Sequence, residues 1–180
     1  MTASKNPLID DIKIRIPCSS DARKMKDAYL RNREYLTPWE PARSEDFFTV
    51  AGQNKILETR LASYAAGSEV PWVILDADRI IGAITLTGIV LGPFCSANVG
   101  YWVDHEYSGR GIGSAALTHV LGYAKNKMGL HRIQAATLLH NAASQRILQR
   151  AGFESIGVAP AYLKIAGTWQ DHNLYQRILF

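Results

Sequence analysis

The stretch NVGYWVDHEYSGRGIGS, Asn98 to Ser114, decides the fold. Its first six residues, Asn98 to Val103, include β-branched and aromatic side chains and predict a strand. Its last seven, Ser108 to Ser114, form a glycine-rich loop, and the apolar residues that follow repeat at helical spacing. A strand, a glycine-rich loop and a helix in this order bring unpaired helical amides close to a ligand. The pattern therefore favours a bound phosphate or pyrophosphate.

Three kinds of phosphate site compete for this loop, and an ordinary turn is a further alternative because glycines also punctuate chains. A Walker A loop requires a Lys-Ser/Thr pair after the glycines, and this pair is missing. A dinucleotide fingerprint requires a glycine in place of Ser114 and an acidic residue about 20 positions later, and the sequence has neither. Coenzyme A remains, because consecutive amides from Gly109 to Ser114 can cradle its pyrophosphate without a metal. Arg110 adds a positive charge beside the anion.

Outside this loop the chain alternates strand patterns with helix patterns. The expected strands are Ile12 to Ile16, Trp72 to Leu75, Arg79 to Leu86, Asn98 to Val103, Arg132 to Leu139, Phe153 to Val158 and Asn173 to Leu179. The expected helices run from Ser19 to about Tyr35, from Ser44 to about Ser63, from Gly113 to about Met128 and from Asn141 to Gly152. Two of the strands form a hairpin around Asp76 to Asp78. This order predicts an α/β or α+β fold with a mixed sheet covered by helices.

Composition excludes several classes of protein. A chain of 180 residues that is 47% hydrophobic predicts one compact domain over residues 1–180. The net charge of +4 comes without a basic and aromatic module, which argues against specific nucleic-acid binding. Cys18 and Cys95 have no partners at metal-ligand spacing, so no metal site or disulfide framework is expected. Without an apolar leader or a membrane-length apolar stretch, the protein is expected to be cytoplasmic and independent of membranes.

The loop resembles the signature Gln/Arg-x-x-Gly-x-Gly/Ala at the start of the third helix in the GNAT superfamily of N-acetyltransferases. Ser108, Gly111 and Gly113 occupy its places, and Ser108 departs from the usual Gln or Arg. Three further strings resemble the branch of this family that acetylates N-terminal alanines of ribosomal proteins. They are RNREYLTPWEP (Arg31 to Pro41), NAASQRILQRAGF (Asn141 to Phe153) and GTWQDHNLY (Gly167 to Tyr175).

The resemblance implies a mixed, mostly antiparallel sheet that splays at the cofactor site. It also implies acetyl-CoA as the acyl donor, with the pantetheine arm along an exposed strand edge and the pyrophosphate on the amides of the loop. The cofactor-binding residues expected on this basis are Tyr101, Trp102, Val103, Ser108, Gly109, Arg110, Gly111, Ile112, Gly113, Ser114, Asn141 and Ser144.

Asn141 and Ser144 are implied to lie beside the pantetheine arm and the thioester. Asn141 is also a good helix N-cap on local grounds alone. Ser144 then lies near the positive end of the helix, where its hydroxyl can donate to the leaving thiolate, although a solvent-facing serine is the alternative. Many relatives use a tyrosine seven positions after the Asn for this purpose, but Leu148 stands here. Ser144 or solvent is left to protonate the thiolate, with Tyr162 as a distant reserve.

The acceptor must be a neutral amine when it attacks, so its pKa determines how strong a base the site needs. A free α-amine titrates near about 7.7 to 8.0 and a lysine near about 10.4, a difference of roughly 3 to 4 kcal/mol at neutral pH. No carboxylate is marked by its sequence context as a strong buried base, which fits a protein N-terminus better than a lysine. Glu40 is the first candidate to contact or deprotonate the acceptor, with a surface loop carboxylate as the alternative.

Further candidates for binding the acceptor come from two of the strings. Trp39 is expected to line the acceptor groove because it belongs to the PWEP string, and Asp171 and His172 lie on the turn that enters the last expected strand. A structural role is open for each of the three. Two other functions also stay open: an acetyltransferase for small amines such as antibiotics or polyamines, and a non-catalytic module that binds acyl-CoA. A homodimer is left open as well.

Overall fold

Eight strands form one sheet in residues 6–180, the part of the chain that the computed structural model describes. In spatial order they are β1 (Asn6–Ile9), β2 (Ile12–Arg15), β3 (Val70–Asp76), β4 (Arg79–Val90), β5 (Ser96–Val103), β6 (Arg132–Leu138), β8 (Thr168–Ile178) and β7 (Glu154–Ile165). Every neighbouring pair is antiparallel except β5 and β6, which run parallel. The mixed, mostly antiparallel sheet that the resemblance implied is confirmed.

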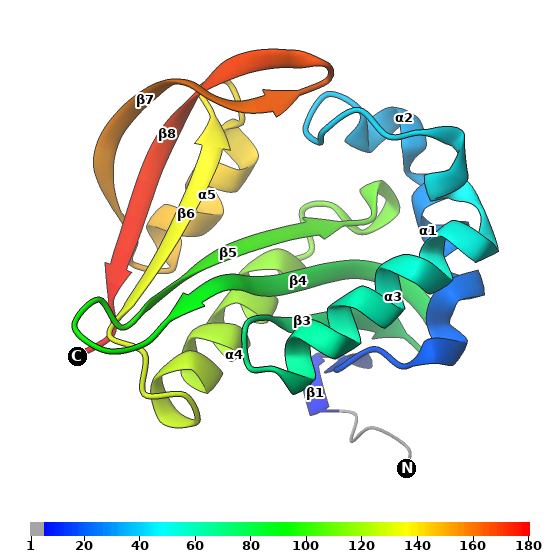
Figure 1. Ribbon diagram of the computed structural model, residues 1–180, viewed down its shortest axis with the longest axis horizontal. Helices are drawn as coiled ribbons and strands as arrows, with labels where there is room; N and C mark the ends of the chain where they lie inside the picture. Colours follow the sequence, from blue (N-terminus) through cyan, green and yellow to red (C-terminus); the bar gives the residue numbers. More distant parts are fainter. Residues whose placement is uncertain (1–5) are drawn as a thin grey trace.

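Helices cover both faces of the sheet (Figure 1). On one face lie α1 (Ala22–Arg31) and α3 (Val50–Ala65), and on the other lie α4 (Ile112–Asn126) and α5 (Ala142–Arg150). The short helix α2 (Arg33–Leu36) follows α1, and three 3-10 turns span Ser19–Asp21, Glu45–Phe48 and His105–Tyr107. Alternate residues of the strands supply the two cores: Leu75 packs with Leu57 on the α1 and α3 side, and Ile84 packs with Leu117 on the α4 side.

The sheet opens between β5 and β6. Only three residue pairs join these strands, from Ser96 opposite Arg132 to Asn98 opposite Gln134. Beyond this point β5 stays paired with β4 and β6 stays paired with β8, so the two strands diverge as a V (Figure 1). The edges of β5 and β6 that face each other in the V have no strand partner.

Two of the predicted helices differ from the structure: one is divided in two and one begins later than expected. The first is divided at Asn32, because the side-chain amide of Asn32 donates to the Ala28 carbonyl (2.9 Å) and the chain turns there. The second was expected to begin at Ser44, but Ser44 opens only the 3-10 turn and its side chain caps nothing. The cap is Thr49, whose Oγ1 accepts a hydrogen bond from the Gly52 amide at 2.9 Å.

The C-terminal hairpin is longer than the sequence predicted. The pattern indicated extended chain over Phe153 to Val158 and Asn173 to Leu179, whereas β7 and β8 continue to a turn at residues 166–167. A register shift between Ala159 and Leu163, with Ala161 in the left-handed region (φ 46°), interrupts the alternation of apolar and polar residues on which the prediction depended. Strand β1 also escaped prediction, because Pro7 argues against a strand, although a proline is tolerated at the sheet edge where β1 lies.

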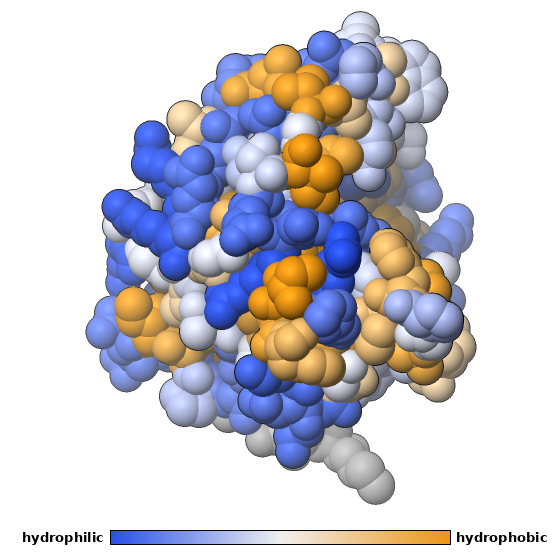
Figure 2. All heavy atoms as spheres, turned by 90° about the vertical axis from the view of Figure 1, so that its left-hand side faces the viewer, coloured by the Kyte–Doolittle hydropathy of each residue, from blue (hydrophilic) through white to orange (hydrophobic). Residues whose placement is uncertain are grey.

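The face at the left of Figure 1 carries apolar side chains in several separate groups among polar ones (Figure 2). Exposed examples are Leu91 and Phe94 near the β4–β5 turn and Phe180 at the C-terminus. None of the helices within residues 6–180 is both long and apolar enough to cross a membrane. The start of the N-terminal segment, from which the sequence predicted no leader, lies outside the described residues.

The position of the α3 cap can be tested by two alanine substitutions. Thr49→Ala should lower the free energy of unfolding by about 1 kcal/mol, because the Gly52 amide loses its side-chain acceptor. Ser44→Ala, at the cap that the sequence suggested, should change it by less than about 0.5 kcal/mol. Urea denaturation of both variants measures the difference, and equal effects would argue against Thr49 as the cap.

Candidate active site

A cavity of about 540 Å³ lies at the open end of the V, between the end of β5 and α5. Its walls come from α2 and the segment after it, the end of β5, the glycine-rich loop, the first turn of α4, and α5. The lining residues are Tyr35, Leu36, Trp39, Tyr101, Trp102, Val103, Tyr107, Ser108, Gly109, Gly111, Ile112, Gly113, Ser114, Asn141, Ala143, Ser144, Arg146, Ile147 and Arg150. Of the predicted cofactor-binding residues, all except Arg110 line this one cavity.

The glycine-rich loop has the backbone shape that a pyrophosphate site needs. Gly109 and Gly111 have φ values of 79° and 78°, a conformation that other residues rarely adopt, and Gly111 is the N-cap of α4. A Cβ on Gly109 would meet no atom within 4 Å, so the backbone there is open to a ligand. The amides in the first turn of α4 have no helical acceptors and carry the positive end of the helix dipole. Arg110 lies over the Tyr107 ring, 5.0 Å from its centroid.

Gly113 allows the helices behind the cavity to approach each other. A Cβ at this position would lie 3.1 Å from Ile147 Cδ1 on α5 and 3.7 Å from Val103 Cγ2 on β5. The absence of a side chain therefore lets α4 pack directly against α5 and the end of β5. The loop, the helix N-terminus and the open strand edge consequently share one cavity that suits the pyrophosphate and the extended arm of coenzyme A.

Two hydroxyl groups meet on the α5 side of the V. The Tyr101 hydroxyl lies 2.9 Å from Ser144 Oγ, and the Ser144 amide donates to Asn141 Oδ1 at 3.1 Å, so Asn141 is the N-cap of α5. Burial raises the pKa of Tyr101 to about 12, against a smaller opposing effect of the hydrogen bond to Ser144. Tyr101 therefore keeps its proton at neutral pH and can donate to Ser144.

Aromatic residues line the opposite side of β5. Trp102 points away from Tyr101, as successive residues of a strand must, and its Nε1 donates to the Tyr29 hydroxyl of α1 at 3.2 Å. Trp39 lines the cavity from the segment after α2, with its ring centroid 5.3 Å from that of His140. The cavity is thus reached by side chains from both faces of the sheet.

Glu40 lines a second cavity of about 190 Å³ beside the first, with Leu36 in the wall of both. Its carboxylate pairs with Arg43 at 3.3 Å and is 19% exposed. Burial raises the pKa of Glu40, and the positive charges of Arg43 and Arg60 only partly oppose this effect. Among the described residues, Glu40 is the one carboxylate in the walls of either cavity.

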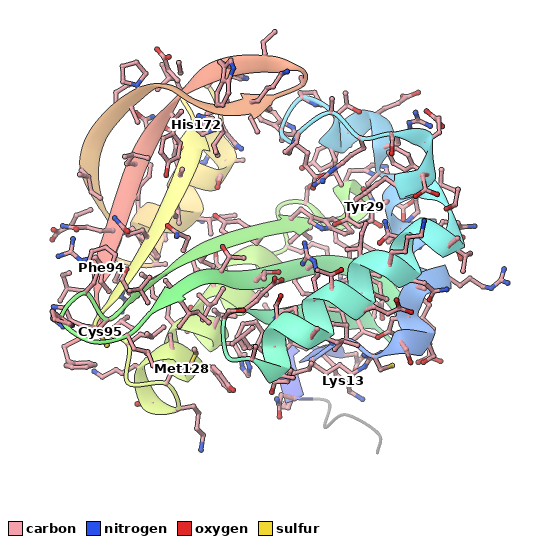
Figure 3. The ribbon with its side chains drawn as sticks, in the orientation of Figure 1. Lys13, Tyr29, Phe94, Cys95, Met128 and His172 are labelled. Carbon is pink, nitrogen blue, oxygen red and sulfur yellow. The ribbon has the colours of Figure 1, made fainter. Side chains whose placement is uncertain are left out.

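Asp171 and His172 line neither cavity. Asp171 is exposed, and its Oδ1 accepts a hydrogen bond from the Ala161 amide at 2.8 Å within the β7–β8 hairpin. His172 is buried, with Nδ1 2.9 Å from the Gln170 carbonyl. In Figure 3, His172 lies with the diverging strands and Tyr29 lies with the helices on the other side of the V. The hairpin still contacts the Glu40 segment, because the Ala166 amide donates to the Glu40 carbonyl at 3.0 Å.

Sequence reasoning missed several residues of the site. Arg146 and Arg150 line the cavity one helical turn apart, and this i, i+4 spacing after the Asn141 cap was a usable signal. Tyr35 also lines it, and its place in the RNREYLTPWEP string was a usable signal. The hydroxyl of Tyr101 beside Ser144 had no signal either, because the two are 43 residues apart. Leu148, where many relatives have tyrosine, is fully buried in the core.

The fold has a splayed sheet, and its cavity has the glycine-rich loop, the helix N-terminus and the strand edge that suit coenzyme A. The family described as acetyltransferase (GNAT) domain matches residues 11–154. The chain belongs to this family and is an acetyl-CoA-dependent N-acetyltransferase.

Three known proteins illustrate the similarity. The [ribosomal protein uS5]-alanine N-acetyltransferase of Escherichia coli is 34% identical over 167 residues, which cover 92% of this chain and 86% of that protein. The crystal structure of ribosomal-protein-S5-alanine acetyltransferase from Vibrio fischeri superposes with a TM-score of 0.92 at 34% identity, covering 97% of this chain and 96% of the other. Mycobacterium smegmatis RimJ in complex with CoA-disulfide superposes with a TM-score of 0.89 at 29% identity, covering 93% and 81%.

The loop assignment can be tested at Gly111 with two side chains of the same shape. Gly111→Asn introduces the residue that best tolerates a positive φ, whereas Gly111→Asp adds a negative charge at the same place. Gly111→Asp should bind acetyl-CoA about tenfold or more weakly than Gly111→Asn, because the charge repels the pyrophosphate. Isothermal titration calorimetry measures both affinities. Equal dissociation constants for the two variants would count against a pyrophosphate at this loop.

Proposed function

We propose that this enzyme acetylates the N-terminal α-amine of a protein, with an alanine-type terminus on a ribosomal protein as the preferred acceptor. The observation that carries the proposal is the division of the site by β5, with a hydroxyl pair on one side and one partly buried carboxylate, Glu40, on the other. The similarity to enzymes named for ribosomal-protein alanine supports the choice of acceptor. An α-amine needs less help to lose its proton than a lysine does, which suits a site with one carboxylate in its walls.

Acetyl-CoA supplies the acetyl group as a thioester, whose carbon–sulfur bond breaks as the new carbon–nitrogen bond forms. In the proposal, the amides of Gly109 to Ser114 hold the pyrophosphate, with Arg110 nearby as a positive charge. The free edge of β5 at Tyr101, Trp102 and Val103 pairs with the amides of the pantetheine arm, as a sheet edge does with an added chain. Asn141 holds the N-terminus of α5 beside that arm.

Ser144 is the proposed acid for the leaving thiolate. When the Tyr101 hydroxyl donates to Ser144 Oγ, the proton of Ser144 is free to point into the cavity toward the sulfur. The first turn of α5 adds the positive end of its dipole, which stabilises a developing negative charge. Tyr101 thereby supplies the hydroxyl function that Leu148 cannot.

Glu40 is the proposed contact for the acceptor ammonium and the group that receives its proton, directly or through a water molecule. Trp39 and Trp102 contribute aromatic walls beside it. The roles of Asp171 and His172 in binding the acceptor stay as predictions. In the proposal these residues act indirectly, because their β7–β8 hairpin contacts the Glu40 backbone. A cytoplasmic location and a homodimer stay as predictions too.

The acid assignment predicts a specific pattern of kinetic defects. Ser144→Ala should lower kcat by about a hundredfold while the acetyl-CoA dissociation constant changes less than about threefold, because the hydroxyl acts on the leaving group. Tyr101→Phe should also lower kcat, and the double variant should be no slower than Ser144→Ala because the two hydroxyls act as one unit. Steady-state kinetics and calorimetry measure the set. An unaltered kcat in Ser144→Ala would remove this residue from the mechanism.

The acceptor class can be tested with matched peptides. A peptide that begins with Ala should be acetylated once, at its α-amine, whereas the same peptide with a blocked N-terminus and an internal Lys should not react. Glu40→Gln should raise the acceptor KM by about tenfold and remove the acidic limb of the pH profile of kcat/KM. Because burial raises the pKa of Glu40, this limb should lie above the ordinary glutamate pKa of about 4.3.

Glu45→Gln is the control for Glu40→Gln. Glu45 lies five residues away on the same segment, is exposed, and pairs with Arg33 at the surface. Its substitution should leave the acceptor KM within about twofold, since surface ion pairs contribute little. Intact-mass spectrometry identifies the acetylated amine. Acetylation of the lysine alone, or of polyamines in preference to every Ala peptide, would refute the proposed acceptor.

A further inference from the structure

Asp104 is a buried carboxylate at the point where β5 ends and the cofactor loop begins. Its side chain has no exposed surface. The Arg31 guanidinium donates to Asp104 Oδ2 from Nε at 2.7 Å, and its Nη2 donates to the Ile80 carbonyl at 2.9 Å. Arg79 approaches the same oxygen more distantly, at 3.6 Å. The last residue of α1 is therefore fixed to the end of β5.

Asn32, the next residue after Arg31, makes a second connection. It is fully buried, and its Oδ1 accepts a hydrogen bond from the His105 amide at 2.9 Å and lies 2.9 Å from His105 Nδ1. Burial alone would raise the pKa of Asp104, but hydrogen bonds from Asn32 and Arg31 outweigh this effect and lower the pKa. Arg31, Asn32, Asp104 and His105 form one connected group, which we call the Asp104 clamp.

The Asp104 clamp joins the two segments that carry the active site. On one side it is followed by α2 and the residues up to Glu40, and on the other by the loop Ser108 to Ser114. A third contact lies beyond the clamp, where the Tyr35 hydroxyl is 3.4 Å from Ser108 Oγ. The four residues of α2 are too few to form a stable helix alone, so contacts outside α2 must set its position.

We propose that Arg31 and Asn32 are positioning residues, which hold the segment Arg33 to Glu40 in register with the cofactor loop. The inference rests on the proposed function only in taking Trp39 and Glu40 as the acceptor side. A positioning role explains why the side chains of Asn32 and Asp104 are buried at this junction. A gain in stability would not explain it, because buried ion pairs stabilise a fold poorly. It also gives a use to Arg31 and Asn32, the first two residues of the RNREYLTPWEP string, which lie outside both cavities.

The experiment compares Asn32→Ala with the wild-type enzyme by hydrogen exchange, calorimetry and kinetics. Asn32→Ala should raise amide exchange in residues 33–40 by about tenfold, because the segment loses its fixed point. Residues 111–114 should still be protected by coenzyme A, whose dissociation constant should stay within about threefold, since those residues belong to α4 and its own cap. With an Ala peptide, kcat/KM for the acceptor should fall by about tenfold or more.

Arg31→Met and Arg79→Met form a matched pair, because each removes one guanidinium from Asp104 but only Arg31 connects it to α1. Arg31→Met should reproduce the exchange of Asn32→Ala, and Arg79→Met should leave exchange and kinetics within about twofold. Thermal melts establish that each variant is folded, and Asn32→Ala, which leaves the Arg31–Asp104 ion pair intact, carries the test if Arg31→Met is not folded.

Two outcomes would overturn the inference: unchanged exchange in residues 33–40 of Asn32→Ala, or a parallel loss of coenzyme A binding and acceptor turnover, which would indicate a general structural role. Because hydrogen exchange is measured without turnover, a wrong acceptor can be distinguished from a wrong positioning role. In that case residues 33–40 respond as expected while no Ala peptide is acetylated by the wild-type enzyme.

Discussion

The parting of β5 from β6 after three residue pairs is the constraint on which the rest of this structure depends. On its other edge β5 pairs with β4, and β6 pairs with β8. The hydrogen bonds that β5 and β6 do not make with each other in the V are therefore not replaced by another strand. An unpaired strand edge inside a protein leaves backbone amides and carbonyls that need partners. The extended amide chain of pantetheine can supply such partners, so in the proposed function the incomplete sheet is what makes the V a binding site.

The alternation of side chains along β5 then separates the two halves of the reaction. Tyr101 and Trp102 are adjacent in the sequence, yet one reaches Ser144 on α5 and the other reaches Tyr29 on α1. A strand with a partner on both edges would bury both residues in separate cores. At the open edge of β5 they instead line a single cavity, so that groups from both layers of helices can act on one bond.

The sequence predicted most of the elements and the cofactor loop, because these depend on local patterns. Gly109 and Gly111 have positive φ angles, which glycine adopts readily, and Asn141 caps α5 as its type suggested. The predictions fail where residues far apart in the sequence determine the local structure. Asn32 interrupts a helix that its neighbours favour, since its side chain is occupied by Ala28 and His105. Ser44 and Thr49 are both good caps by type, and only packing selects Thr49. Tyr101 and Ser144 meet through the fold alone.

Burial acts on the two titratable groups of the proposed mechanism with opposite chemical results. It raises the pKa of Tyr101, which makes this residue a more persistent proton donor beside Ser144 on the leaving-group side. It also raises the pKa of Glu40, which makes this carboxylate a stronger base on the acceptor side. The raised pKa of Glu40 suits a group that takes a proton from an amine, whereas the raised pKa of Tyr101 keeps its hydroxyl protonated as a hydrogen-bond donor to Ser144. Because β5 lies between the two groups, the proposed mechanism has the amine lose its proton on one face of the sheet and the thiolate gain one on the other. In that mechanism the splay that admits the cofactor also sets the direction in which protons move.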